Sequence, residues 1–197
     1  MGNNFNKTYV NRRSTFNFDL TKDFDTDAFK NVLELFSSNM PSKQFKFPYQ
    51  IDILDWSDRG LRSKIFYGTT PRSYLEETDI YNNQILAPVL ISFTQELPGE
   101  YISPLEIGMA VMALTLLLQS NGFLTSFCEC IEDPAYLGKI ITNNDSSYVR
   151  VFLCVGQHAY PNGTTSIPNP FGEPISAKWN ITQTDVPNIK YQIDNSK

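Results

Sequence analysis

The stretch from Ser103 to Asn121 limits most strongly what this chain can fold into, because it holds the longest apolar run of the sequence. The run extends from Ile107 to Leu118 and is interrupted by Gly108 and Thr115. A transmembrane helix needs about 20 apolar residues, so this run is too short to cross a bilayer. A helix that is apolar on most of its faces must be covered by other parts of a protein. The sequence therefore predicts a helix that lies in a core or in a subunit interface.

The ends of this predicted helix carry capping signals. Ser103 is a good N-cap, Pro104 suits the first helical position, and Glu106 completes a capping box with Ser103. Gly122 follows the apolar run and suits the left-handed position at which many helices end. These signals predict that the helix begins near Ser103 and stops before Gly122.

Shorter segments supply the other predicted elements. Apolar residues three and four apart predict a helix from Asp25 to Phe36, with Asp25 or Thr26 as its N-cap. Apolar and β-branched runs predict the strands Gln50 to Leu54, Lys64 to Tyr67, Pro88 to Thr94, Val149 to Val155 and Ile189 to Ile193. This order predicts an α+β fold in a single domain over 1–197, with a core over about 10–157 and a C-terminal extension over about 158–197 that wraps over a partner subunit.

The composition argues against several classes of partner. The chain has 16 Lys and Arg against 21 Asp and Glu and no concentrated basic face, which argues against nucleic acid. Its three cysteines are an odd number at loose spacing, which favours a reducing compartment over a disulfide framework. The segment MGNNFNKTYVNRR lacks the apolar stretch of a signal peptide, and Asn6 does not fit the myristoylation pattern. We therefore expect a soluble, cytoplasmic protein without a membrane partner.

The segment GFLTSFCECIED, at 122–133, raises the question of a metal or redox site. Cys128 and Cys130 are one residue apart, whereas structural zinc sites favour C-x₂₋₄-C pairs in twos. The further ligands besides carboxylates are Cys154, which lies in an apolar strand, and the single histidine, His158. The pattern predicts no metal site, and nothing in it places a cysteine beside His158 for nucleophilic catalysis.

Two other short patterns offer ligands for a phosphate and for a heterocycle. Arg12, Arg13 and Ser14 combine guanidinium groups, which match phosphate oxygens, with a hydroxyl donor. Asn83 and Gln84 can donate and accept hydrogen bonds at once, which suits the edge of a heterocycle. Each pattern also has a plainer interpretation, as a solvated basic patch and as a turn before a strand.

The order of five segments bears on these alternatives, because it is similar to the order found in a known family. They are RRST, MPSKQ, NNQILAPVLI, LEIGMAVMALTLLLQSNGF and VFLCVG, and they extend from about Arg12 to Gly156. In this order the chain resembles the FMN-dependent nitroreductase family. The resemblance implies a nitroreductase-like α+β fold, with a mixed, mainly antiparallel sheet flanked by helices. It also implies a homodimer, with the helix from Ser103 to Asn121 at its centre and FMN at the subunit interface.

The resemblance assigns site residues position by position. It implies that Arg12 and Ser14 bind the FMN phosphate, with Arg13 nearby. Pro41 and Ser42 fall at the flavin ring.

The remaining assignments concern the ring and its edge. Asn83 and Gln84 fall at the ribityl chain or the ring edge, and Gln44 supplies an amide there only after a shift of register. Glu129 matches the family glutamate beside the ring. Cys130 takes the place of the glycine whose backbone N–H points at flavin N5.

The sequence also departs from the family pattern. The asparagine and glutamine positions of the turn after the first helix are Phe45 and Phe47, and the basic position two residues after R-x-S is Phe16. The C-terminal basic clamp on the phosphate is not evident, since Lys178 and Lys190 fit it poorly. Each lost charged contact costs about 1.5–3 kcal/mol, so we expect weaker FMN binding than the full pattern gives.

The resemblance implies an FMN-dependent NAD(P)H oxidoreductase that reduces nitroaromatic, quinone or similar small-molecule acceptors in a ping-pong cycle. An alternative from another class is a degenerate dimer that binds flavin weakly or not at all and has a binding or structural role. A third is other flavin chemistry on the same scaffold, such as flavin fragmentation or dehalogenation.

Overall fold

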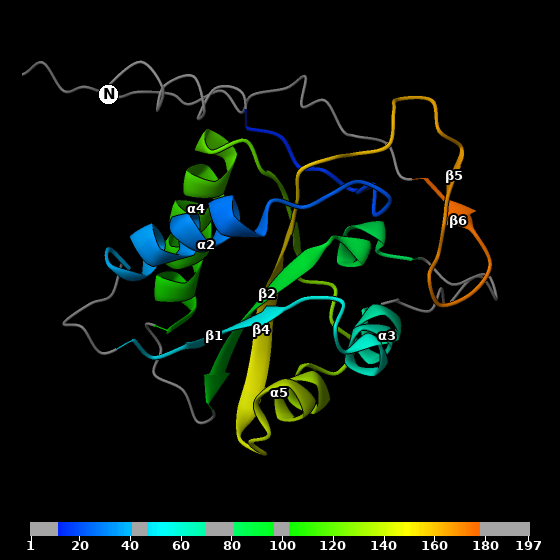
Figure 1. Cartoon of the computed structure of the whole chain (residues 1–197). Helices are drawn as coiled ribbons and strands as arrows, with labels where there is room; N and C mark the ends of the chain where they lie inside the picture. The colour runs from blue at the N-terminus through cyan, green and yellow to red at the C-terminus, as the bar shows by residue number, and fades with distance from the viewer. Residues whose placement is uncertain (1–11, 41–46, 70–80, 97–102, 178–197) are drawn as a thin grey trace, which may run out of the picture.

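The computed structural model describes residues 12–40, 47–69, 81–96 and 103–177 (Figure 1). Its centre is a four-stranded antiparallel sheet in the order β1-β2-β4-β3. The strands are β1 (Gln50–Leu54), β2 (Val89–Glu96), β4 (Ser147–Gly156) and β3 (Leu124–Cys128). Strands β2 and β4 are central and almost wholly buried, whereas β1 and β3 form the edges.

Helices cover both faces of this sheet. On one face lie α2 (Thr26–Ser37) and α4 (Ser103–Ser120), and on the other lie α3 (Arg59–Gly68) and α5 (Pro134–Thr142). The short elements η2 (Asn83–Leu86), β5 (Ser166–Ile167) and β6 (Ile175–Ser176) complete the described chain. Two apolar cores result, one on each face of the sheet, as expected for an α+β fold.

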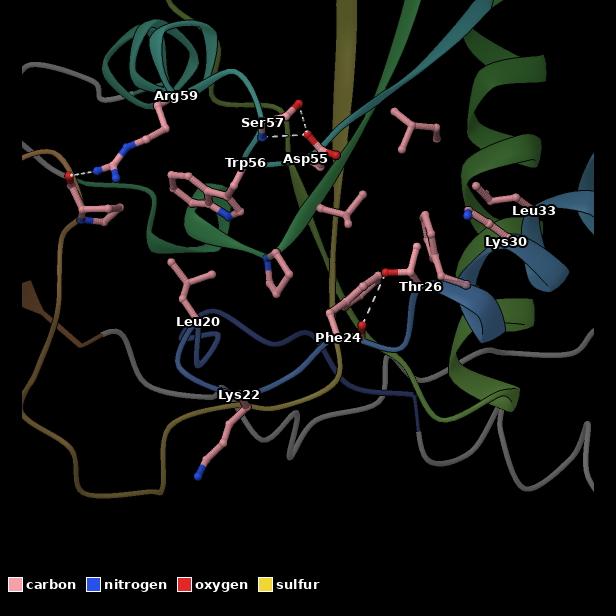
Figure 2. Close-up of a pocket in the computed structure, with 15 residues that line it drawn as sticks. Leu20, Lys22, Phe24, Thr26, Lys30, Leu33, Asp55, Trp56, Ser57 and Arg59 are labelled. Atoms are coloured by element: carbon pink, nitrogen blue, oxygen red, sulfur yellow. Dashed lines mark hydrogen bonds between the residues drawn. The ribbon is translucent and has the colours of Figure 1, made fainter.

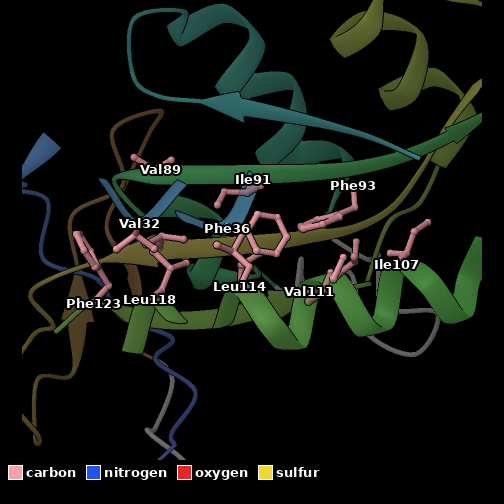
Figure 3. Packing of buried hydrophobic residues seen from close by; sticks show 14 of the residues in the cluster. Val32, Phe36, Val89, Ile91, Phe93, Ile107, Val111, Leu114, Leu118 and Phe123 are labelled. Atoms are coloured by element: carbon pink, nitrogen blue, oxygen red, sulfur yellow. The ribbon is translucent and has the colours of Figure 1, made fainter. Parts of the chain in front are cut away.

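Helix α4 fills most of the first core (Figure 3). Ile107, Val111, Leu114 and Leu118 are buried against α2 and the sheet. None of the described helices is long and apolar enough to cross a membrane.

A left-handed residue ends α4 as predicted. Gly122 has φ 85°, and the N–H of Phe123 donates to the Leu118 carbonyl at 3.1 Å. The Gly122 N–H donates to the Gln119 carbonyl at 3.2 Å, which completes a Schellman-type end. The chain then leaves α4 directly into β3.

The structure confirms the predicted helices around 25–36 and 103–121 and the predicted strands around 50–54, 88–94 and 149–155. The predicted strand Lys64 to Tyr67 is wrong, because these residues belong to α3. The Asp58 side chain accepts from the Leu61 N–H at 2.8 Å and starts that helix. Strand β3 and helix α5 were not predicted, and the predicted strand 189–193 lies outside the described residues.

Close packing between α5 and β4 gives a test of this arrangement. A Cβ atom added to Gly138 would lie 2.5 Å from the Ser147 carbonyl carbon and 2.7 Å from the Tyr148 nitrogen. We expect Gly138→Ala to lower the free energy of unfolding by about 1–3 kcal/mol, because backbone atoms have to move apart. Chemical denaturation measures the change. Gly60→Ala in α3, where the new Cβ meets only the Asp58 side chain at 3.4 Å, is the control and should be neutral or stabilising.

Candidate functional site

The segment with Arg12, Arg13 and Ser14 lies along the edge strand β3. Ser14 forms a parallel bridge with Thr125, and the Thr15 N–H donates to the Thr125 carbonyl at 2.9 Å. Because the segment joins the first half of β3, its two guanidinium groups and its hydroxyl stand near the beginning of that strand.

Gln119, the last residue but one of α4, holds this segment in place. Its Nε2 donates to the Arg13 carbonyl at 2.9 Å and to Thr125 Oγ1 at 2.6 Å. Arg13 is exposed and donates from Nη1 to the Arg12 carbonyl at 2.9 Å, whereas Arg12 and Ser14 are half-buried. The predicted phosphate ligands are therefore held by their backbone, with side chains at the surface.

Glu129 and Cys130 follow the other end of β3 directly. Both are exposed, and the Cys130 N–H donates to no turn or loop carbonyl of the described residues. Glu129 follows Thr125 by four positions, which corresponds to about 13 Å in an extended chain. One edge strand thus has a cationic segment near its beginning and a carboxylate just past its end.

Glu129 also lines a cavity of 330 Å³ beneath α4, together with Phe127, Met112 and Arg150. Arg150 Nε donates to Gln95 Oε1 at 2.9 Å, and its guanidinium lies over the Tyr148 ring, 4.7 Å from the ring centroid. Arg150 was not predicted as a site residue. In the sequence it can be noticed only as a cation inside the apolar run VRVFLCV.

The two amides of η2 differ in their hydrogen bonding. Asn83 Nδ2 donates to Asn17 Oδ1 at 3.1 Å and to the Ser176 carbonyl at 2.8 Å. Gln84 is also buried, but its Oε1 has no hydrogen-bond partner among the described residues. Since η2 packs against β3 and β4, both amides adjoin the strand that carries the other predicted ligands.

A buried arginine that the sequence analysis missed holds η2 in place. Arg62 donates from Nη2 to the carbonyls of Ile85 and Ala87, at 2.8 and 2.6 Å, and from Nη1 to the Leu54 carbonyl at 2.9 Å. Burial lowers the pKa of its guanidinium to about 10, which leaves it charged at neutral pH. Arg62 therefore ties α3 and the end of β1 to the element that presents Asn83 and Gln84.

The cysteines are placed differently from one another. Cys128 and Cys154 are buried, and burial raises the pKa of the Cys154 thiol well above its ordinary value. Cys130 is exposed. Across the described ranges, no three His, Cys, Asp or Glu side chains are grouped so that they could hold a metal ion.

Several predicted ligands lie outside the described residues. They are Pro41, Ser42 and Gln44 in the turn after α2. Lys178 and Lys190, which fit the C-terminal basic clamp poorly, also lie outside the described residues. Arg12, Arg13, Ser14, Asn83, Gln84, Glu129 and Cys130 are described, and all of them lie on or beside β3.

Comparison with solved structures finds proteins of similar fold. No protein-family model matches this chain, and no curated protein matches it. A nitroreductase with bound FMN from Bacteroides fragilis is 16% identical, with a TM-score of 0.63, and the match covers 92% of this chain and 97% of that one.

Two further solved structures give similar values. A nitroreductase family protein from Clostridium novyi is 16% identical, with a TM-score of 0.62 and coverage of 78% of this chain and 84% of that one. An FMN-dependent nitroreductase from Mycobacterium smegmatis, solved in complex with NADPH, is 10% identical, with a TM-score of 0.62 and coverage of 80% and 88%. The chain therefore has the nitroreductase fold, which confirms the fold that the sequence resemblance implied.

The fastening of the N-terminal segment can be tested by hydrogen exchange. Gln119→Leu removes the hydrogen bond from α4 to the Arg13 carbonyl and the one from α4 to Thr125, together worth about 1–3 kcal/mol. We expect the Thr15 amide to exchange about tenfold faster or more, as measured by NMR or mass spectrometry. Asn121→Ala is the control, because its side chain bonds only within the end of α4. Unchanged protection of Thr15 in Gln119→Leu would contradict this account.

Proposed function

We propose that this protein is an FMN-dependent NAD(P)H oxidoreductase that reduces nitroaromatic, quinone or similar acceptors. One observation carries the proposal. The segment with Arg12 and Ser14 is hydrogen-bonded to β3, and Glu129 follows the far end of the same strand. A phosphate ligand set and a ring neighbour thereby lie near the two ends of one strand, about 13 Å apart.

The described residues fit FMN at both ends. Arg12 and Arg13 offer forked donors, and Ser14 a hydroxyl, to the phosphate. Gln84 Oε1 is a buried acceptor without a donor among the described residues, and such atoms are uncommon unless a ligand or water satisfies them. An N–H of the flavin ring is a donor of the required kind once the Gln84 amide turns toward it.

The remaining residues orient the ring. The backbone N–H of Cys130 offers a donor to flavin N5, and the Glu129 carboxylate lies beside it. Pro41, Ser42 and Gln44 are proposed to approach the ring from the turn after α2. When bound, FMN supplies a two-electron carrier that takes hydride from NAD(P)H and passes electrons to the acceptor in alternate half-reactions.

The exposed face of α4 supports a homodimer. Leu105, Met109 and Met112 are 63%, 52% and 41% exposed, although they are large apolar side chains. They border a 600 Å³ hollow that is lined by uncharged residues of α4. Contiguous apolar surface of this kind marks an interaction site, and we propose that two copies of α4 meet there. Of the extension over about 158–197, residues 158–177 pack on this chain's own second core through Ile167 and Ile175, and the remainder is proposed to wrap over the partner.

One observation favours a second candidate, a dimer of the same fold that has lost flavin. The Asn83 amide, which the resemblance places at the ring edge, already donates to Asn17 and Ser176. A ligand that accepts from Asn83 Nδ2 has to replace these bonds. In either case the three free cysteines suit the cytoplasm, where thiols stay reduced.

The visible spectrum decides between these candidates. The oxidoreductase should be yellow as purified or after reconstitution with FMN, should bleach with NADPH or NADH, and should regain colour with a nitroaromatic. A protein that stays colourless with excess FMN would refute the oxidoreductase and support the second candidate.

Substitution of Arg12 tests the phosphate contact. Because a charged hydrogen bond contributes about 1.5–3 kcal/mol, Arg12→Ala should raise the Kd for FMN about tenfold or more, as measured by flavin fluorescence. Lys64→Ala, on the exposed side of α3, is the control and should leave the Kd unchanged. An Arg12→Ala protein with unaltered affinity would remove this residue from the proposed site.

Substitution on α4 tests the homodimer. Met109→Lys places a charge in the centre of the proposed interface, where its burial without a partner is costly. We expect the sedimentation coefficient to change from that of a dimer to that of a monomer. Leu35→Lys is the matched control, since Leu35 is 53% exposed on α2 and away from this face. A dimer that survives Met109→Lys but not Leu35→Lys would place the interface on α2 instead.

A further inference from the structure

The chain contains the sequence Asn-Gly twice, as Asn121-Gly122 and as Asn162-Gly163. In such a pair the backbone nitrogen of the glycine can attack the asparagine side chain, because no Cβ atom hinders its approach. Both pairs are exposed, and a Cβ atom added to either glycine would meet nothing within 4 Å beyond its chain neighbours. Neither access to water nor steric room therefore distinguishes the two pairs, and their hydrogen bonds decide how each one reacts.

The pair Asn121-Gly122 is held by hydrogen bonds at the end of α4. Asn121 Nδ2 donates to the Leu117 carbonyl at 2.8 Å and to Ser120 Oγ at 3.3 Å. The Gly122 N–H donates to the Gln119 carbonyl at 3.2 Å. The attacking nitrogen and the side chain under attack are thus both bonded elsewhere, and they can meet only after the end of α4 opens.

The pair Asn162-Gly163 lies in a turn that does not use these groups. The Thr164 N–H and hydroxyl donate to the Pro161 carbonyl, at 3.2 and 2.8 Å, and close the turn around the pair. Gly163 has φ 92°, a left-handed conformation that glycine adopts without strain. Within the part of the chain that the structure describes, the Asn162 side chain forms no hydrogen bond, and the Gly163 N–H donates to no turn or loop carbonyl. The pair can therefore rotate toward ring closure without losing a hydrogen bond of its own.

The chain is held on both sides of this turn. Before it, the Tyr160 N–H donates to the Asn17 carbonyl at 2.9 Å. After it, Ile167 is buried in the second core, and Arg59, which lines the pocket shown in Figure 2, donates to the Pro170 carbonyl at 3.0 Å. Because these contacts lie outside the turn, the turn can rearrange while the rest of the domain stays folded.

We propose that Asn162 is a site of spontaneous deamidation in the folded protein, whereas Asn121 is protected. The Gly163 nitrogen gives up its proton to the solvent and attacks the carbonyl carbon of the Asn162 side chain. The new N–C bond replaces the bond to the side-chain NH₂ group, which takes a proton and leaves as ammonia. Water then opens the cyclic imide at either of its carbonyls and leaves an aspartate or an isoaspartate. No residue of the turn is proposed to contact flavin, so this inference does not rest on the proposed function.

Peptide mapping by mass spectrometry tests the proposal on the full-length protein, incubated at mildly alkaline pH. Deamidation replaces NH₂ by OH and changes the peptide mass, and chromatography separates the aspartate and isoaspartate products. We expect Asn162 to react about tenfold faster than Asn121 or more, because only Asn121 requires hydrogen-bonded structure to open first. Equal rates at the two sites, or faster reaction at Asn121, would overturn the proposal.

An unfolded sample and a variant complete the test. In urea both pairs lose their surroundings, so their rates should become similar, since glycine follows asparagine in each. A difference as large as that in the folded protein would also overturn the proposal, because local sequence would then set the rates. Asn162→Gln, whose longer side chain closes a less favourable ring, should remove the fast acidic species on isoelectric focusing. An acidic species that forms at the original rate in Asn162→Gln would assign the modification to another residue.

Discussion

Burial of α4 is the constraint on which the rest of this structure depends. Ala110, Leu114 and Leu118 are wholly buried, so the sheet and α2 must both reach the helix. The sheet and α2 cover two sides of α4, and the remaining side carries Met109 and Met112 at the surface. A helix that is apolar nearly all round has no side suited to water, and the uncovered face therefore needs a partner. The same physical fact explains the inner packing and the proposed homodimer.

The end of α4 also positions the candidate site. Gly122 adopts a left-handed conformation that turns the chain at once into β3, and Gln119 lies one turn earlier, within reach of Thr125 and Arg13. On the other face of the sheet, Arg62 holds η2 through its carbonyls. The predicted ligands are thus placed by interior hydrogen bonds that are independent of any ligand, which is the way a preorganised site is built.

The sequence predicts correctly those helices and strands that a short apolar run or period identifies without a distant partner. The α4 run and the apolar strand within 88–94 need no distant partner to be recognised. The segment Lys64 to Tyr67 is wrongly predicted as a strand, because four mostly apolar residues show no period. The helix depends on the Asp58 cap, six residues before Lys64. Strand β3 is not predicted because Thr125 and Ser126 are polar and its pairing partners in β4 lie 24 (Cys128 with Phe152) to 32 (Leu124 with Gly156) positions ahead. Such non-local pairing leaves no trace in a short window.

The sequence order placed Asn83 and Gln84 near the site, but it did not reveal how each amide is bonded. Asn83 Nδ2 would have to give up two hydrogen bonds, each worth about 0.5–1.5 kcal/mol, before it could donate to a ligand. Gln84 gives up none for its Oε1, which has no partner among the described residues. If the fold retains FMN as proposed, the lower free-energy cost favours Gln84 for the ring-edge contact, the second of the two amides that the resemblance places there. Since a fold alone does not determine function, this difference between two adjacent amides bears on flavin binding more directly than the overall likeness does.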